Sequence, residues 1–106
     1  MALRRIKLIV AYDGTNYCGW QVQPNGVSIQ AMLQKHIEAL TGEKIMLTGA
    51  SRTDSGVHAL GQAAVFDTSK PWPADRFVPE LNQRLPKDIV IQSAEEVPTD
   101  FHPRYQ

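Results

Sequence analysis

Cysteine is almost absent from this chain, and long apolar runs are absent altogether. Cys18 is the single cysteine among 106 residues, so no disulfide can form within the chain, which fits a protein of a reducing compartment. No apolar run approaches the roughly 18 residues of a membrane-spanning helix. The first residues also lack the apolar stretch of a secretory signal peptide. We therefore expect a cytoplasmic protein that does not associate with membranes.

The chain also has no excess of charge of either sign, because 11 Lys and Arg residues balance 11 Asp and Glu residues. A domain that bound nucleic acid through bulk electrostatics alone would be basic. The balance argues weakly against such binding but leaves room for a local basic patch. Arg4, Arg5 and Lys7 cluster near one end, and Arg52 lies in the middle of the chain.

Motifs for common cofactors are missing as well. The sequence contains neither a G-x-G-x-x-G nor a G-x-x-x-x-G-K-[ST] phosphate-binding loop. Its three histidines, His36, His58 and His102, have no metal-ligand spacing, and no second cysteine accompanies Cys18. We therefore expect neither a nucleotide cofactor nor a metal.

What the sequence does contain is the pattern of one globular domain. Its length suits a single domain, and its 42% hydrophobic and 21% charged residues are ordinary for a folded protein. Residues 3–12 alternate, with Ile6, Leu8, Val10 and Tyr12 on one side. This period of two, rich in β-branched residues, predicts a strand.

Residues 28–41 carry an apolar stripe at helical spacing. Ser28 can cap the start of this helix, and Gly42 suits the position just past its C-terminus. The rest of the chain predicts, in order, a strand over 43–48, a strand over 61–68, a helix over 77–85, a strand over 88–96 and a polar tail over 97–106.

This order of elements, β-α-β-β-α-β, is that of the ferredoxin-like α+β fold, an antiparallel four-stranded sheet with two helices on one face. In that topology the second and third strands form a hairpin, and residues 49–60 are its loop. The loop protrudes from one end of the sheet, where it can reach a molecule outside the domain.

The sequence GASRTDSGVH, residues 49–58, is longer than an ordinary connection and nearly free of apolar residues. In an extended segment, residues two apart point the same way, so Arg52 and Asp54 can lie side by side. The guanidinium would then lower the pKa of the carboxyl, and an ionised carboxylate suits nucleophilic or electrostatic work at an electron-poor carbon. The alternative is an exposed ion pair in a turn. His58 could likewise be a general acid or base, or a surface residue that only packs and forms hydrogen bonds.

A second segment, residues 17–23, places aromatic and amide side chains after Tyr12. Tyr12 and Trp20 could stack on exposed bases, and Gln21 could form hydrogen bonds to them. In the alternative interpretation, Trp20 closes the core and the glutamines are solvated. Residues 60–67 lack the exposed aromatic residues with which RNA-recognition modules stack bases on their third strand, so binding in that style is disfavoured.

Three separated segments match the motifs of one family, in the order in which that family has them. Residues 12–23, YDGTNYCGWQVQ, fit Y-x-G-x-x-Y-x-G-W-Q-x-Q; residues 51–59, SRTDSGVHA, fit G-R-T-D-x-G-V-H-A; and residues 101–105, FHPRY, fit F-H-A-R-[FY]. Through these segments the chain resembles the tRNA pseudouridine synthase A family over nearly its whole length. Ser51 and Pro103 stand where the family usually has glycine and alanine.

The resemblance implies an enzyme that isomerises uridine to pseudouridine in the anticodon stem-loop of tRNA, without a cofactor or a metal. Asp54 would be the catalytic aspartate, and Arg52 would pair with it and help to hold the flipped nucleotide. Three mechanisms stay open. The carboxylate could attack C1′, add to C6 of the ring, or remove a proton on a route through a glycal. The other residues that would bind or position the substrate are Thr53, His58, Tyr12, Trp20 and Gln21.

The resemblance also bears on size and partners. Family members are considerably longer, with a second similar domain after the F-H-A-R segment. We therefore interpret residues 1–106 as an N-terminal domain, with 97–106 leading to a missing second domain, and we expect the whole protein to be a homodimer that binds tRNA. Residues 1–106 alone are expected to fold but to be inactive. Two other interpretations stay open: a non-catalytic RNA-binding module on the same scaffold, and a ferredoxin-like protein-interaction domain.

Overall fold

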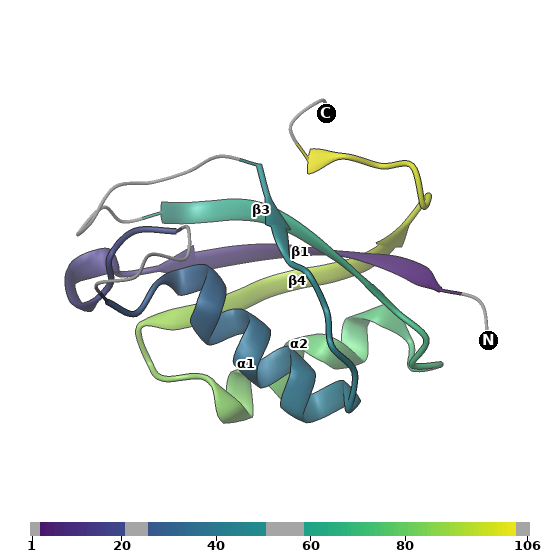
Figure 1. Ribbon diagram of the computed structural model, residues 1–106, viewed down its shortest axis with the longest axis horizontal. Helices are drawn as coiled ribbons and strands as arrows, with labels where there is room; N and C mark the ends of the chain where they lie inside the picture. Colours follow the sequence, from purple (N-terminus) through teal and green to yellow (C-terminus); the bar gives the residue numbers. More distant parts are fainter. Residues whose placement is uncertain (1–2, 21–25, 51–58, 104–106) are drawn as a thin grey trace.

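The computed structural model describes residues 3–20, 26–50 and 59–103 of the chain (Figure 1). Its strands form one antiparallel sheet in the order β2-β3-β1-β4. Both α-helices lie on the same face of this sheet (Figure 1). The predicted ferredoxin-like α+β arrangement is therefore confirmed.

The strands are β1 Arg4–Tyr12, β2 Thr48–Gly49, β3 Ala59–Thr68 and β4 Ile89–Val97, and the α-helices are α1 Ile29–Thr41 and α2 Phe77–Arg84. Two short 3-10 helices, Gly14–Asn16 and Ala74–Arg76, follow β1 and precede α2. Apart from β2, these bounds agree with the predicted ones to within two residues. Within the described ranges, the helices fall short of the length and hydropathy that crossing a membrane requires.

The central strand β1 supports the core because it has a neighbour on each side. It pairs with β3 along one edge and with β4 along the other. Its alternate side chains Ile6, Leu8, Val10 and Tyr12 are buried, as predicted. Complete burial of an aliphatic side chain contributes about 1.5–3 kcal/mol. These residues share one apolar cluster with side chains of the two helices, among them Ile29, Leu33, Ile37, Phe77 and Leu81.

Helix α1 has the two caps that its sequence predicts. The Ser28 side chain accepts a hydrogen bond from the main-chain N–H of Ala31 at 3.0 Å, so Ser28 precedes the helix rather than belonging to it. At the other end, Gly42 has a φ of 73°, and its N–H donates to the carbonyl of Glu38 at 2.8 Å. Glycine adopts this left-handed conformation without the steric cost of a Cβ atom.

The prediction of a strand over 43–48 is wrong in extent, because β2 comprises only Thr48 and Gly49. The preceding residues run alongside α1, and polar side chains of that helix take the place of a strand ladder. Gln34 Oε1 accepts from the N–H of Leu47 at 3.1 Å, and Gln30 Nε2 donates to the carbonyl of Leu47 at 2.7 Å. These two bonds satisfy the N–H and the carbonyl of Leu47, so this residue needs no partner strand. The segment can therefore have the apolar pattern of a strand without belonging to the sheet.

The basic cluster at the start of β1 is paired with acids on the neighbouring strands, which all but neutralise it. Such cross-strand pairs leave little free positive charge for a partner. The pairs are Arg4–Glu96 at 2.9 Å, Arg5–Asp67 at 2.8 Å and Lys7–Glu95 at 3.5 Å.

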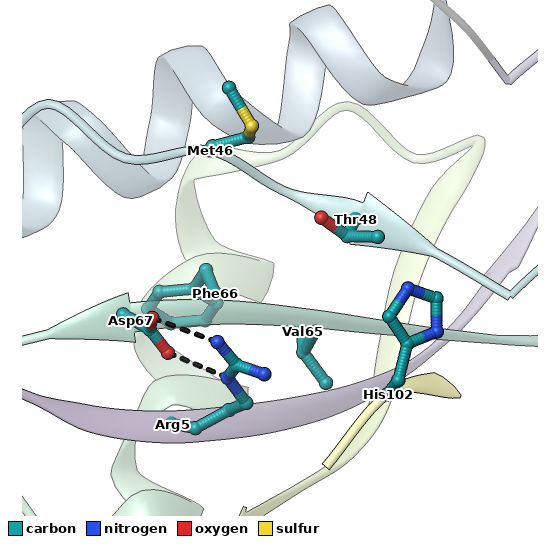
Figure 2. A pocket seen from close by; sticks show the side chains of 7 residues that line it. All are labelled: Arg5, Met46, Thr48, Val65, Phe66, Asp67 and His102. Carbon is teal, nitrogen blue, oxygen red and sulfur yellow. Dashed lines mark hydrogen bonds and ion pairs between the residues drawn. The ribbon is translucent and has the colours of Figure 1, made fainter. Parts of the chain in front are cut away.

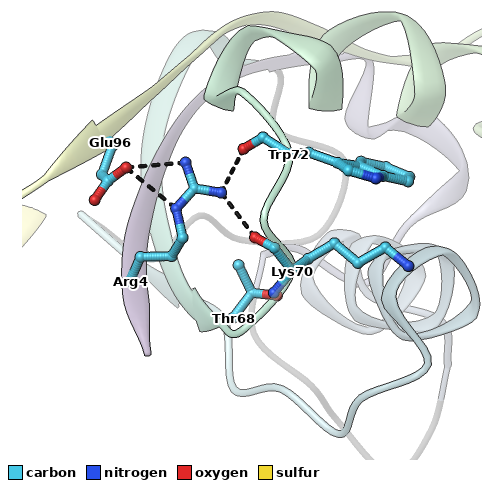
Figure 3. A network of polar contacts seen from close by, with 5 residues as sticks. All are labelled: Arg4, Thr68, Lys70, Trp72 and Glu96. Carbon is cyan, nitrogen blue, oxygen red and sulfur yellow. Dashed lines mark hydrogen bonds and ion pairs between the residues drawn. The ribbon is translucent and has the colours of Figure 1, made fainter. Parts of the chain in front are cut away.

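Arg4 also fixes the connection between β3 and α2 (Figure 3). Its guanidinium donates to the main-chain oxygens of Lys70, at 2.8 Å, and of Trp72. The Trp72 ring in turn packs against Phe77 of α2, with 5.5 Å between ring centroids. Arg4 therefore ties together three parts of the chain at the end of the sheet where β1 begins and β3 ends.

His36 of α1 is half-buried, and its pKa is lowered from the usual value. Burial is the largest cause, followed by the positive charges of Lys35 and Arg84. The folded chain therefore favours the neutral imidazole ring.

We expect the free energy of unfolding to decrease as the pH falls below 6.5, the ordinary pKa of a histidine. The unfolded chain then binds a proton at His36 that the folded chain does not, and this loss continues until the pH has passed the lower pKa of the folded state. His36→Gln removes this difference. Denaturant titrations at about pH 7.5 and about pH 5.5 should show a smaller loss in the variant than in the wild type. An equal loss in both proteins would contradict the account.

Candidate active site

The predicted site residues fall into two groups. Tyr12 and Trp20 belong to the described part of the chain, whereas the remaining predicted residues lie outside it. These are Gln21, in residues 21–25, and Arg52, Thr53, Asp54 and His58, in residues 51–58. The structure therefore shows the supports of the R-T-D segment, and the roles of its own side chains stay predictions.

Both ends of residues 51–58 are fixed to the sheet. On the near side, Gly49 pairs with Ala64 of β3, and the N–H of Ala50 donates to the carbonyl of Ala63 at 2.8 Å. On the far side, Ala59 begins β3 and pairs with Tyr12 at the end of β1. The predicted hairpin of the second and third strands is confirmed, and the residues on both sides of its loop are paired within the sheet.

Two aromatic rings lie beneath these two ends. Trp20 is 3% exposed and Tyr12 is 4% exposed, and their ring centroids are 6.1 Å apart. The Trp20 ring also lies against the main chain of Gly49, the residue at which β2 ends. This burial favours the interpretation in which Trp20 closes the core over the one in which it stacks on a base.

Helix α1 fixes the main chain of the segment that carries Trp20. The N–H groups of the first helical turn have no partner within the helix, and here two of them bind the incoming segment. Ile29 donates to the carbonyl of Gly19 at 3.0 Å, and Gln30 donates to the carbonyl of Trp20 at 2.9 Å. Trp20 is thus held at its main chain by α1 and at its ring by the core.

The same segment is tied to the connection between α2 and β4. The hydroxyl of Tyr17 donates to Asp88 Oδ1 at 2.7 Å, and the N–H of Asp13 donates to the carbonyl of Asp88 at 2.9 Å. The pKa of Tyr17 is raised, first by burial and then by its hydrogen bond to Asp88 and the charge of that carboxylate. The phenol therefore stays protonated and keeps donating to Asp88 well into the alkaline range.

The third motif segment lies against the sheet face that the helices leave open. Arg5 of β1 donates two hydrogen bonds to Asp67, at 2.8 and 3.0 Å, and a third to the carbonyl of Phe101 at 2.6 Å. The ammonium of Lys7 lies 5.4 Å from the centroid of the Phe101 ring. These contacts hold the residues that follow β4 across the open face.

A small pocket of about 130 Å³ lies between this segment and β2 (Figure 2). The His102 ring points toward Thr48, which immediately precedes the anchor residue Gly49 (Figure 2). The structure thus brings the third motif segment beside the strand that leads into residues 51–58. The lining residues are Arg5, Met46, Thr48, Val65, Phe66, Asp67 and His102.

Sequence reasoning did not identify Gly49 as a support of the site. The available signal was an isolated glycine next to a strand, which often marks a close approach of another group to the main chain. Among the residues that the structure describes, no group of three or more His, Cys, Asp or Glu side chains could hold a metal ion.

Comparison with known proteins gives a consistent result. A family model described as tRNA pseudouridine synthase matches residues 8–106. The tRNA pseudouridine synthase A of Acetivibrio thermocellus is 56% identical over 104 residues, a match that covers 98% of this chain and 43% of the relative. The enzyme of the same name from Citrifermentans bemidjiense is 54% identical, with 97% of this chain and 41% of the relative covered. That of Geotalea daltonii is 52% identical, with 96% and 42% covered. The chain spans less than half the length of these relatives.

We expect Tyr17→Phe to lower the free energy of unfolding by about 1–2 kcal/mol, because it removes a hydrogen bond to a charged acceptor. Asp88→Asn keeps an oxygen that can accept from Tyr17 and should lose less. Denaturant titration of the wild type and both variants measures the difference. A Tyr17→Phe variant as stable as the wild type would show that this contact does not anchor the segment.

Proposed function

Because this chain belongs to the tRNA pseudouridine synthase family, we propose that the protein isomerises uridine to pseudouridine in the anticodon stem-loop of tRNA. The observation that carries the proposal is the family match, which runs through residues 51–58 and their two fixed ends. An active-site group gains most of its effect from being held in position. Residues on both sides of this loop pair with neighbouring strands, which makes it a suitable support for such a group.

The reaction exchanges one bond of the base for another. The bond between C1′ and N1 breaks, the uracil turns, and C1′ joins C5; C5 loses its proton and N1 gains one, so atoms and electrons balance without an oxidant or a reductant. We assign the central role to the carboxylate of Asp54. It would attack C1′, as the nucleophilic carboxylate of a retaining glycosidase does, or add to C6 of the ring, or remove a proton on a route through a glycal.

Arg52 is assigned to the pair with Asp54. Its planar guanidinium can bind a carboxylate or a phosphate through two parallel hydrogen bonds. It would keep the Asp54 carboxyl ionised and help to hold the uridine outside the base stack, where unstacking costs a few kcal/mol. Thr53, His58 and Gln21 are assigned to binding or positioning of the substrate.

For Tyr12 and Trp20 we propose a positioning role. Both rings are buried, so neither presents a face on which a base could stack. The Trp20 ring lies against the main chain of Gly49 before the loop, and the main chain of Tyr12 pairs with Ala59 after it. We further propose tRNA as the partner and a homodimer as the assembly of the whole protein.

The proposal can be tested in a chain that joins residues 1–106 to the part of the Acetivibrio thermocellus relative that they do not match, here called the joined enzyme. Pseudouridine formation releases the hydrogen at C5, so tRNA labelled with tritium at C5 of its uridines reports turnover. We expect Asp54→Asn to abolish release while the melting temperature stays close to that of the wild type. The swap is nearly isosteric and removes only the charge of the carboxylate.

Activity of Asp54→Asn within about tenfold of the wild type would refute the assigned role, because a nucleophile or charge stabiliser contributes far more. Binding of tRNA is the matched control. A wild-type joined enzyme that binds the anticodon arm and releases no tritium would favour the non-catalytic RNA-binding module instead.

Arg52→Lys tests the second assignment. Lysine keeps the positive charge but loses the planar fork, so we expect turnover to fall much more than thermal stability. The measurement pairs tritium release with a melting curve of the same preparation. If the melting temperature collapses while the activity of the folded fraction is kept, Arg52 is a structural residue and its assigned role is wrong.

A further inference from the structure

The space beside Gly49 is already filled by the indole ring of Trp20. A Cβ atom placed on Gly49 would lie 2.6 Å from Cε2 and Nε1 of Trp20 and 2.8 Å from its Cζ2. Real Cβ atoms do not approach other heavy atoms so closely. Among the described glycines, only Gly19 and Gly42 have a positive φ. Gly49 is therefore required by a close approach and not by its backbone conformation.

The Trp20 ring has little freedom to give way. Its side chain is 3% exposed, it packs beside Tyr12, and its main-chain carbonyl is bound by the first turn of α1. The strand β2, in contrast, lies at the edge of the sheet, and among the described residues its ladder consists of Thr48 with Val65 and Gly49 with Ala64, next to the hydrogen bonds of Leu47 and Ala50. A side chain at position 49 would therefore displace the main chain of β2 more easily than the ring.

A displacement of β2 acts directly on the loop that follows it. Ala50 is the last described residue before residues 51–58. Its N–H donates to the carbonyl of Ala63 of β3 at 2.8 Å, so Ala50 is bound to the strand with which β2 pairs. The far end of the loop begins at Ala59, which pairs with Tyr12, the second ring of the aromatic pair. The Trp20 ring thus lies at the residue before the loop, and Tyr12, whose ring packs beside Trp20, pairs with the residue after it.

We propose that Gly49 is a positioning residue of the reaction: its missing side chain lets Trp20 pack on the main chain and so sets the position of Ala50, from which the chain continues to Asp54. This inference rests on the proposed function, because it needs Asp54 to act from that loop. Misplacement of a reacting group by about 1 Å can reduce a rate by about 10²-fold. Contacts of tRNA with parts of the protein outside this loop do not depend on β2, so we expect a larger effect on kcat than on KM.

The test compares four forms of the joined enzyme by steady-state tritium release and by melting curves. Gly49→Ala should lower kcat at least about tenfold and change KM by a smaller factor. Adding Trp20→Leu to Gly49→Ala removes Cε2, Nε1 and Cζ2, the three ring atoms that the new Cβ would meet, so the double variant should recover part of the lost kcat. The matched control is Gly61→Ala, because a Cβ there would meet only the side-chain atoms Gln92 Oε1 and Ile9 Cγ2, both at 3.4 Å. We expect its kcat to stay near that of the wild type.

Two outcomes would overturn the inference while leaving the proposed function intact: a Gly49→Ala enzyme with a kcat within about twofold of the wild type, or a double variant no faster than Gly49→Ala alone. The double variant decides the matter even if Gly49→Ala folds poorly, because relief of the overlap should restore folding and kcat together. A wild-type joined enzyme that releases no tritium would instead refute the proposed function and this inference with it.

Discussion

The apolar face of β1 lies within the core that the helices share, while its two edges pair with β3 and β4. Ile6, Leu8 and Val10 are fully buried in this face. A one-residue slip of β1 would turn these side chains to the open face of the sheet and bring Arg5 and Lys7 into the core. The register of β1 therefore fixes the positions of the strands on both sides of it.

That register also decides what lies at the end of β1. Tyr12 is the last residue of the strand, it pairs with the start of β3, and its ring lies beside Trp20. Trp20 in turn lies on Gly49, at the end of β2. The core of the domain and the supports of residues 51–58 are thus one continuous set of contacts. For the proposed function this means that stability and catalytic geometry depend on the same packing.

The sequence predicts most of the fold because alternation and capping are local signals. Ser28 and Gly42 mark the limits of α1, and the alternate apolar residues of β1 mark its buried face. The extent of β2 is not predictable in this way, since Gln30 and Gln34 of α1 replace its ladder from a distant part of the chain. The motif segments point to the candidate site, but the local sequence does not show which group requires a glycine at position 49. It comes from Trp20, whose contact with Gly49 exists only after folding.

The most direct test of the account is a map of pseudouridine at single-nucleotide resolution in tRNA. Unmodified tRNA is incubated with the joined enzyme and with its Asp54→Asn variant, and each uridine is then examined chemically. The account predicts new pseudouridine within the anticodon stem-loop with the wild-type protein and none with the variant. Pseudouridine confined to other parts of the tRNA, or the same map with both proteins, would contradict it.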